Sequence, residues 1–433
     1  MSAEPIIRRD PVDTGRTYLC IDLKSFYASV ECIDRGFDPF DTNLVVADPD
    51  RCDTTICLAV SPALKKLGVP GRCRVFQIPK NIKYIKAKPR MKRYMEVSAQ
   101  IYGIYLQMFS PQDIHVYSID ECFIDVTPYL SLYKSTAKEI AVEAIDRVHN
   151  ATGICATAGI GTNLFLCKVA LDIQAKHVED HIGFLDEVAF RKSIWHHRPL
   201  TDIWGFGPGI TRRLQKYDVY DLEGITHIDE RFLFNEFGSN AEFIIDHAWG
   251  YETCTIKDIQ AYRPKGHSIS NGQVLARDYT AREASTVLRE MVTASALDLV
   301  EQGLVTNCIS LYIGYSWNEA LVPSAGASRK LPAYTNSRNG LQAYFLDVFA
   351  EICDPSRPIR RVNIGMGSLM PEDLVEHSLF EDTVRVAAEH HLSEATLAVQ
   401  QRFGKDALIR GVSLRKEATQ RERNKQVGGH NAE

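Results

Sequence analysis

A short acidic step, Asp120–Glu121, constrains this chain most, because it stands between two apolar runs that are typical of β-strands. The segment reads His115-Val-Tyr-Ser-Ile-Asp-Glu-Cys-Phe-Ile-Asp-Val126. Neighbouring side chains of a regular strand point to opposite faces, so two adjacent acids can reach one site only at a turn or a strand end. We therefore predict two strands that meet at a tight corner carrying both carboxylates.

A third acid, Asp22, ends another apolar run that begins at Tyr18. Three carboxylates on strand ends suit a hard ion such as Mg²⁺, which prefers oxygen ligands. Two such ions, about 3.5–4 Å apart, can drive in-line phosphoryl transfer. Taken singly, each acid is better explained as an ordinary solvated residue at a strand end, and the acids alone leave that alternative open.

Two longer motifs contain these acids, and a third motif follows them in the chain. They are Asp22-Leu-Lys-Ser-Phe-Tyr-Ala-Ser-Val-Glu31, Ser118-Ile-Asp-Glu-Cys-Phe-Ile-Asp125 and Gly159-Ile-Gly-Thr-Asn-Leu-Phe-Leu-Cys-Lys-Val-Ala-Leu-Asp172. In this order they resemble the Y-family translesion DNA polymerases. The late segments Arg402-Phe-Gly-Lys405 and Glu422-Arg-Asn-Lys-Gln-Val-Gly-Gly-His430 resemble the polymerase-V-like (UmuC-like) branch of Gram-positive bacteria and their mobile elements. The resemblance covers nearly the whole chain.

The resemblance implies an α+β, multidomain fold: a right-hand polymerase with a palm, small fingers, a helical thumb containing a helix-hairpin-helix, and a ferredoxin-like βαββαβ little finger. The boundaries that we expect are a loose N-terminus at 1–16, a palm at 17–175 with fingers inserted at about 33–92, a thumb at 176–255, a linker at 256–265, a little finger at 266–370, and a C-terminal tail at 371–433 with an amphipathic helix near 384–401.

The resemblance also implies the metal ligands. These are the carboxylates of Asp22, Asp120 and Glu121 with the backbone carbonyl of Leu23, and together they would hold two Mg²⁺ ions. Such a pair activates the primer 3′-hydroxyl and neutralises the leaving pyrophosphate, while the protein supplies positioning.

The incoming nucleotide is expected at the start of the helix after the first strand, where Ser25 is the expected N-cap, followed by Phe26 and Tyr27. In the family, the position of Tyr27 carries the ring that clashes with a 2′-hydroxyl. Core packing is the alternative for Tyr27, and Phe26 is expected in the core. Backbone N–H groups from Lys24 to Tyr27 would add donors for the triphosphate.

The triphosphate also needs cations, and the resemblance assigns this role to Lys65 and Lys168. The sequence departs from many members at Pro62, which stands where they have a tyrosine and which offers neither a hydroxyl nor an N–H group. Lys65 offers a point charge where an arginine fork would bind bidentately. A solvated helix lysine is the open alternative for both residues.

A glycine-rich turn with Gly205, Gly207 and Gly209, followed by Arg212, resembles a helix-hairpin-helix that grips the DNA backbone. Such a turn aims backbone N–H groups at a phosphate, although a plain interhelical turn fits nearly as well.

The net charge of −5 argues weakly against nucleic acid, but Ser61–Arg93 holds eleven basic residues and no acid. We expect that run to form a local anion-binding face.

The segment Glu376-His-Ser-Leu-Phe380 resembles the short peptide by which bacterial polymerases dock on the sliding clamp. Leu379 and Phe380 would be its anchors in an apolar groove. Glu376 and His377 replace the usual glutamine and leucine, so an exposed apolar pair is an equally good explanation.

No run of apolar residues is long enough for a membrane helix, which needs about 20. The eleven cysteines lie mostly in apolar runs without a Cys-x-x-Cys pair, as expected for buried thiols in the cytoplasm. These features favour a cytoplasmic protein, and the resemblance implies a template-directed translesion DNA polymerase of the SOS type. Its partners would be primer–template DNA, dNTP, a sliding clamp, and possible UmuD-like or recombinase accessory proteins. The alternatives are a nucleotidyl cyclase and a non-catalytic DNA- or clamp-binding protein that keeps the fold.

Overall fold

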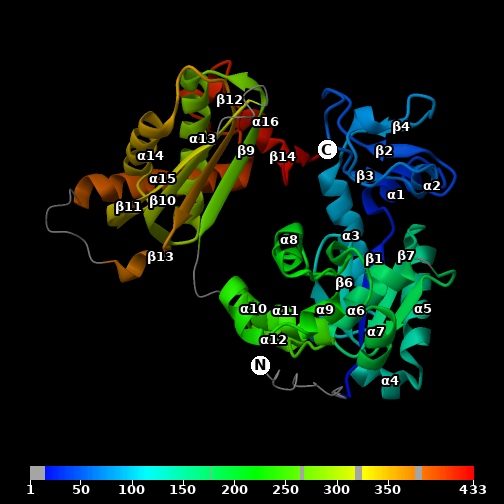
Figure 1. Cartoon of the computed structure of the whole chain (residues 1–433). Helices are drawn as coiled ribbons and strands as arrows, with labels where there is room; N and C mark the ends of the chain where they lie inside the picture. Colours follow the sequence, from blue (N-terminus) through cyan, green and yellow to red (C-terminus); the bar gives the residue numbers. More distant parts are fainter. Residues whose placement is uncertain (1–14, 177, 264–267, 317–323, 376–382) are drawn as a thin grey trace. The chain divides into compact units, whose positions relative to one another are not determined.

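The computed structural model describes residues 15–176, 178–263, 268–316, 324–375 and 383–433, and it divides into two compact units (Figure 1). The first unit runs to Tyr262 and also contains His430–Glu433, while the second spans Arg263–Gly429. The division at Tyr262 falls within the segment that was expected to be a linker. Within that segment, however, Ile256–Ala261 form the helix α12, because Thr255 and Asp258 make a reciprocal capping box.

A five-stranded sheet forms the centre of the first unit. Its strand order is β5 (Ile114–Val116), β6 (Glu121–Asp125), β1 (Tyr18–Leu23), β7 (Ala156–Gly161) and β8 (Ile182–Leu185). Strand β1 is antiparallel to both of its neighbours, and β8 is parallel to β7. The sheet therefore extends past residue 175, where the palm was expected to end, because β8 pairs with β7.

Helices cover this sheet at close range. Helices α5 (Ala137–Thr152) and α6 (Leu164–Val169) and the π-helical turn η3 (Ala170–Ala175) pack on it, while α1 (Phe26–Ile33) and α4 (Thr127–Tyr133) follow β1 and β6 along the chain. Gly159 and Gly161 let α6 approach β7, since a Cβ atom on either glycine would overlap the backbone of Cys167. The apolar side chains between β1 and α6 include Tyr18, Cys20 and Leu164, which are all buried. This packing fixes the position of α6 relative to the strand that carries Asp22.

A small three-stranded sheet lies in the segment expected to form the fingers. It consists of β3 (Ala59–Val60), β2 (Leu44–Val46) and β4 (Ile85–Ala87), in that order, with α2 (Pro62–Lys66), η1 (Val75–Gln77) and then α3 (Met91–Tyr105) along the chain. Its core contains Val45, Cys57, Leu64 and Val69. Helix α2 begins at Pro62 because Ser61 caps it by accepting a hydrogen bond from the Leu64 N–H group.

Acids from other segments pair with five of the eleven basic residues in the run 61–93, which was expected to form a local anion-binding face. The pairs are Arg90 with Glu31 and Asp34, Arg93 with Asp34, Lys86 with Asp53, Lys88 with Asp50, and Lys92 with Glu433. A composition window cannot reveal these pairs, since the partners are distant in sequence.

The rest of the first unit is helical. Its elements are α7 (Glu187–Ser193), η4 (Leu200–Asp202), α8 (Pro208–Leu214), η5 (Gln215–Tyr217), α9 (Leu222–Thr226), α10 (Glu230–Phe237) and α11 (Asn240–Trp249). A single apolar cluster joins these helices to Phe165 and Leu166 of α6. This shared core explains why the helical part and the sheet form one unit.

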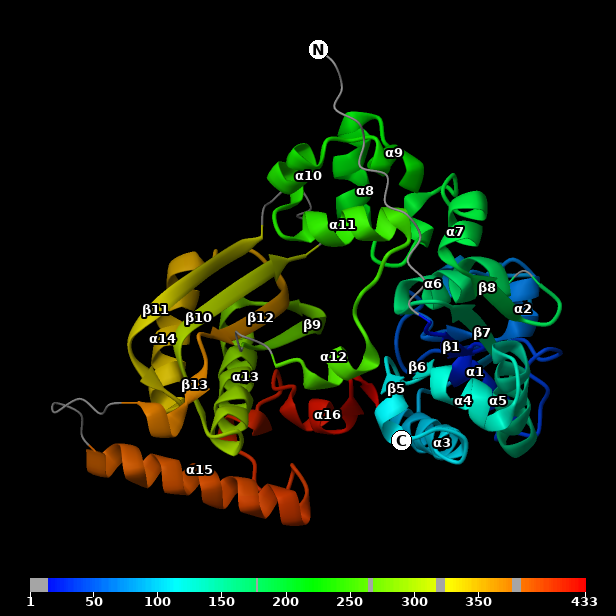
Figure 2. The same cartoon turned by 90° about the horizontal axis from the view of Figure 1, so that it is seen from below.

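The second unit has the predicted βαββαβ order. It consists of β9 (Ile269–Tyr279), α13 (Ala281–Glu301), β10 (Leu304–Tyr315), β11 (Ala325–Thr335), α14 (Arg338–Ile352) and β12 (Ile359–Gly367), with sheet order β11-β10-β12-β9. Helices α13 and α14 lie side by side and supply buried residues such as Leu288, Met291 and Phe345 to the common core (Figure 2). Alternate residues of β12 are buried, as expected for a sheet with one covered face.

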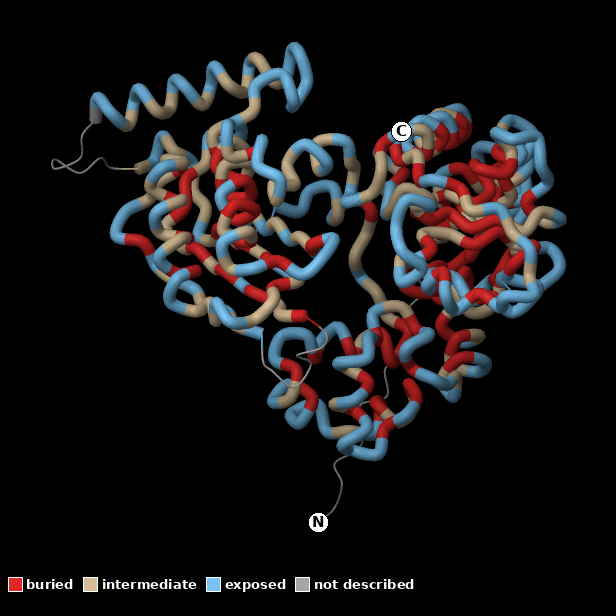
Figure 3. Tube along the Cα trace, turned by 90° about the horizontal axis from the view of Figure 1, so that it is seen from above, coloured by how far each residue is buried: buried red, intermediate tan, exposed pale blue. Residues whose placement is uncertain are grey.

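The described part of the C-terminal tail contains more elements than the one expected helix. It contains β13 (Met370–Pro371), η7 (Glu372–Leu374), α15 (Thr383–Phe403), η8 (Gly411–Leu414), α16 (Gln420–Asn424), β14 (Gln426–Val427) and β15 (His430–Asn431). The prediction of an amphipathic helix near 384–401 is wrong in one respect: no residue from 384 to 403 is buried, so α15 has no apolar face against a core (Figure 3). The predicted clamp anchors Leu379 and Phe380 and most of the N-terminal segment 1–16 lie outside the described residues.

Candidate active site

Strand pairing brings the three predicted acids to one end of the sheet. Asp22 on β1 lies directly opposite Glu121 on β6, so both side chains start from the same face. Asp120 precedes β6, and its carbonyl oxygen accepts a hydrogen bond from the Leu23 N–H group at 2.9 Å. The corner predicted between the two apolar runs is present, between β5 and β6.

Ser118 holds the Asp120 side chain in this corner. Its hydroxyl donates to Asp120 Oδ1 at 2.7 Å and accepts from the Asp120 N–H group at 3.3 Å. The N–H groups of Tyr117 and Ser118 both donate to the carbonyl oxygen of Glu121, which closes the turn. A carboxylate fixed in this way loses little side-chain entropy when it binds an ion.

The electrostatics of the corner favour a cation. Burial raises the pKa of Asp22 to about 7, and the negative charges of Asp120 and Glu121 add to the rise. A carboxylate pKa that is raised this far indicates negative charge that the surrounding groups do not balance. Hard oxygen donors with unbalanced negative charge fit Mg²⁺, and Asp22, Asp120 and the Leu23 carbonyl are suitable ligands.

Glu121 is engaged elsewhere. Its Oε1 atom lies 2.6 Å from Lys168 Nζ and accepts a hydrogen bond from the Cys20 thiol at 3.1 Å. Across the residues that the structure describes, the ligand atoms of the three acids do not all lie within 4.8 Å of one another. Glu121 must therefore turn or share its carboxylate to join the other two at a metal.

Lys168, expected to contact the triphosphate, is held inside the fold. Its side chain is 9% exposed and pairs with Glu121 and, at 3.0 Å, with Asp172. Lys176 pairs with the same Asp172 from its exposed position beyond the π-helical turn η3, and its charge opposes the rise in the pKa of Asp22. Sequence reasoning missed Lys176. Its spacing of eight residues, about two helical turns, after Lys168 was the available signal.

Lys65 at the end of α2 lies near the same acids. The residue as a whole is exposed, but burial of its ammonium group lowers its pKa. The negative charge of Asp22 raises this pKa, and the positive charge of Lys176 lowers it. Lys65 and Lys176 thus bring two positive charges into the neighbourhood of Asp22. This arrangement could hold a polyanion beside the acidic corner.

Tyr27 and Phe26 have different environments at the start of α1. Phe26 is buried, as expected for a core residue. Tyr27 is half-buried, its pKa is raised by burial and by the charge of Asp120, and its ring stacks on Tyr94. The ring of Tyr27 therefore lies close to the acidic corner, as a residue that contacts the nucleotide sugar must.

Ser25 precedes α1 but does not cap it with its side chain, contrary to expectation. It adopts the left-handed conformation, with φ 49°, and its side chain makes no cap hydrogen bond. The Lys24 N–H group also differs from its expected role, since it donates to the carbonyl oxygen of Cys155 at 2.9 Å. Strained backbone of this kind is often found at functional sites, because the surrounding fold must maintain it.

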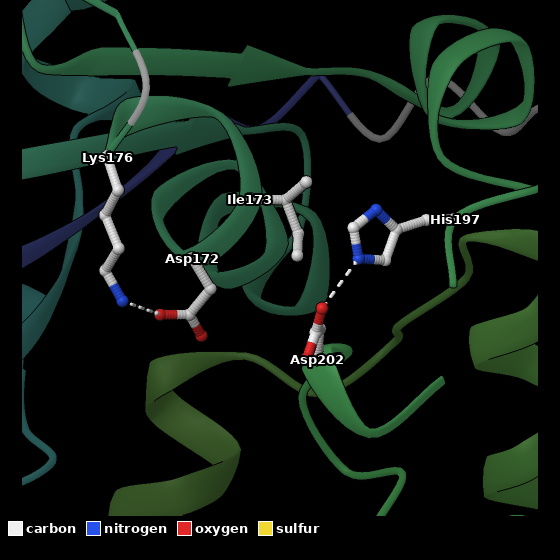
Figure 4. A pocket seen from close by; sticks show the side chains of 5 residues that line it. All are labelled: Asp172, Ile173, Lys176, His197 and Asp202. Carbon is white, nitrogen blue, oxygen red and sulfur yellow. Dashed lines mark hydrogen bonds and ion pairs between the residues drawn. The ribbon is translucent and has the colours of Figure 1, made fainter. Parts of the chain in front are cut away.

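A hollow of about 420 Å³ lies beside the π-helical turn η3. It is lined by Asp172, Ile173, Lys176, His197 and Asp202 (Figure 4). Two pairs, Lys176 with Asp172 and His197 with Asp202, face each other across the Ile173 side chain. The three acids do not line the hollow, but Asp172 connects it to Glu121 through Lys168.

The predicted phosphate-binding turn precedes α8. Gly205 has φ +91°, and a Cβ atom there would overlap the Phe243 ring, so this position requires glycine. Gly207 is the N-cap of α8, and both it and Gly209 have open space around them. Arg212 is exposed in the last turn, and its Nε atom donates to the Pro208 carbonyl oxygen.

Comparisons with known proteins identify relatives of this chain. The model of the impB/mucB/samB family matches residues 21–172, and that of the family's C-terminal domain matches residues 266–379. UvrX of Bacillus subtilis strain 168, whose name refers to UV-damage repair, is 29% identical over 419 residues, which are 96% of this chain and 97% of UvrX. DNA polymerase IV 2 of the same organism is 27% identical, with 95% and 97% covered.

A solved chimera of the Y-family DNA polymerases Dbh and Dpo4 has the same fold. It matches with a TM-score of 0.62 and 17% identity over 82% of this chain and 99% of its own. Among the described residues, no helix is both long and apolar enough to cross a membrane.

Proposed function

This chain belongs to the impB/mucB/samB family of Y-family DNA polymerases, in its UmuC-like branch, and from that premise we propose that it copies DNA past damaged bases by two-metal-ion phosphoryl transfer. Membership establishes a DNA-directed DNA polymerase. The translesion role, the metal ligands and the nucleotide contacts are the proposal.

The observation that carries the chemistry is the acidic corner. Asp22 and Asp120 lie close enough for the charge of one to raise the pKa of the other, and Glu121 starts from the same face. Bound Mg²⁺ would activate the primer 3′-hydroxyl and neutralise the leaving pyrophosphate. Asp22, Asp120, Glu121 and the Leu23 carbonyl would hold the ions, and Ser118 keeps Asp120 oriented.

The other residues position the nucleotide. We assign Lys65 and Lys176 to the triphosphate, because both carry positive charge beside Asp22. Tyr27 would lie under the sugar and exclude a 2′-hydroxyl. Lys168 would act indirectly, by holding Glu121 and Asp172 in place. Most of the catalytic effect in such a site comes from positioning and charge stabilisation.

The substrates implied by a DNA polymerase are primer–template DNA and dNTP. We propose in addition that Leu379 and Phe380 dock the chain on a sliding clamp. A cytoplasmic location and accessory proteins of the UmuD or recombinase kind stay predictions from the sequence.

Primer extension on undamaged and lesion-containing templates tests the proposal. Asp120→Asn should abolish extension with Mg²⁺ while DNA binding persists, because positioning survives when metal activation is lost. The matched control is Asp125→Asn at the other end of β6, whose carboxylate accepts from the Thr127 N–H group and should be dispensable. Extension by Asp120→Asn near the wild-type level would refute the metal assignment. A wild-type chain that extends undamaged primers but always stops at lesions would refute the translesion role.

A further inference from the structure

The second unit contains a group of metal-ligating side chains far in sequence from the acidic corner. His390, His391 and Glu394 of α15 each offer a ligand atom, and these atoms all lie within 4.8 Å of one another. No other group of three or more His, Cys, Asp or Glu residues meets this condition in the described part of the chain. The polymerase mechanism uses none of these residues.

Both imidazoles approach one carboxylate oxygen. The Nδ1 atom of His391 lies 3.1 Å from Glu394 Oε2, and the Nδ1 atom of His390 lies 3.7 Å from the same oxygen. The helix brings them together because residues three and four apart share one face. The Glu394 side chain is 54% exposed, so an ion can reach the group from solvent.

A second carboxylate orients one of the imidazoles. The Nε2 atom of His390 lies 3.2 Å from Glu372 Oε2, and Glu372 belongs to η7, not to α15. A proton on Nε2 that is donated to Glu372 leaves the Nδ1 lone pair of His390 directed at the group. Metal-binding histidines almost always donate their other N–H group to a carboxylate, carbonyl or water in this way.

We propose that His390, His391 and Glu394 bind a divalent cation of the zinc class, with Glu372 as the outer carboxylate that orients His390. Two imidazole nitrogens and a carboxylate oxygen suit Zn²⁺, and a water would complete four ligands. Mg²⁺ prefers an all-oxygen set and would compete poorly here. The bound ion would stiffen α15 and, through His390 and Glu372, join it to η7.

An ordinary surface His–Glu pair provides the comparison. His196 Nδ1 lies 3.3 Å from Glu223 Oε2 in the first unit, with a similarly exposed imidazole, but the adjacent His197 pairs with Asp202 instead of joining this group. The proposal therefore predicts that His391 matters for metal binding and that His196 does not.

The test is a Zn²⁺ titration of the full chain by competition with a chromogenic chelator, in excess Mg²⁺ and with thiols alkylated so that cysteines do not contribute. Wild type should bind one equivalent that His391→Ala loses. Glu372→Gln should bind that equivalent at least about tenfold more weakly, as expected for loss of an outer carboxylate. His196→Ala should match wild type.

Equal stoichiometry and affinity in wild type and His391→Ala would overturn the proposal. Both exposed histidine variants should keep the wild-type circular dichroism, so a loss of binding will not reflect unfolding. As an independent readout, Zn²⁺ should slow amide hydrogen exchange in α15 of wild type but not of His391→Ala. Unchanged exchange in both proteins would likewise count against the site.

Discussion

The rings of Tyr27 and Tyr94 stack with their centroids 4.5 Å apart and their planes inclined by 21°. The Tyr94 hydroxyl donates to Glu31 Oε1 at 2.8 Å, and Arg90 Nε donates to the same oxygen at 2.8 Å. Glu31 is fully buried, so its charge must be balanced by these partners. The ring of Tyr27 is therefore backed by an aromatic side chain that an ionic network holds in place.

Tyr27→Ala should admit ribonucleotides, because the ring that would meet the 2′-hydroxyl is removed. A steric pocket of this size contributes roughly 10- to 200-fold discrimination, so a loss in that range is expected. The measurement is the ratio of kcat/KM for a ribonucleotide and its deoxyribonucleotide in primer extension. Tyr102→Ala, on the neighbouring helix α3, should leave the ratio unchanged. An unaltered ratio in Tyr27→Ala would show that this tyrosine only packs.

Tyr94→Leu should also weaken sugar discrimination, since Tyr27 loses the ring that fixes its orientation. Tyr94→Phe keeps the ring but removes a hydrogen bond to the buried Glu31, which costs about 1–3 kcal/mol of stability. The phenylalanine variant should thus unfold at lower urea concentration and still discriminate. If both variants discriminate like wild type, the stack is structural and does not position Tyr27.

The parts of this site that the sequence predicted are those with a local cause. The acidic corner follows from two apolar runs around Asp120–Glu121, because the alternation of side chains in a strand leaves few other arrangements. The βαββαβ order of the second unit, which the resemblance implied, is confirmed.

The parts that the sequence did not predict depend on distant partners. Lys168 is drawn into an ion pair with Glu121, 47 positions away along the chain, and Asp34 neutralises Arg90 and Arg93 across a sequence gap of more than fifty residues. The effect of the Lys176 charge on Asp22 likewise arises only in the folded chain. Composition and spacing carry no information on such tertiary pairs.

The stability of the metal-free protein should fall as the pH rises from about 4 to about 7, because of Asp22. Its pKa is about 7 in the fold against an ordinary value of 3.8, so the folded state holds the proton more tightly than the unfolded state. The protonated form therefore stabilises the fold at low pH, and this contribution is lost as the pH rises through 7. Each unit of pKa shift corresponds to about 1.4 kcal/mol, so the loss is at most a few kcal/mol.

Asp22→Asn cannot ionise and should abolish this loss. Urea unfolding in a chelator at pH 5 and pH 8 provides the measurement, with Asp125→Asn as the control that keeps the wild-type pH dependence. Mg²⁺ at pH 8 should restore stability to wild type but not to Asp22→Asn. Parallel pH profiles for wild type and Asp22→Asn would contradict the raised pKa.

Replacing both Leu379 and Phe380 by Ala should remove stimulation of synthesis by the sliding clamp without changing clamp-free activity. Glu376 replaces an amide donor by a charge, so the affinity should be weak, on the order of micromolar or poorer. Leu374→Ala is the control, since Leu374 is an exposed apolar residue in the neighbouring η7. Full stimulation of the double variant would place the clamp contact elsewhere.

The neighbours Arg212 and Arg213 should differ in their contribution to DNA binding. Arg212 is exposed and donates a hydrogen bond to the Pro208 carbonyl oxygen, whereas Arg213 is paired with Glu236 at 2.7 Å and lies over the Phe237 ring. A lysine or arginine that meets a phosphate releases counterions, so the logarithm of the binding constant falls linearly with the logarithm of the salt concentration. Arg212→Ala should reduce that slope by about one and weaken binding to all sequences alike.

Arg213→Ala should lower stability and leave the slope nearly unchanged, because its charge is already balanced. Equal slopes for wild type and Arg212→Ala in a fluorescence anisotropy titration would show that the turn before α8 is an interhelical connection and not a grip on the DNA backbone.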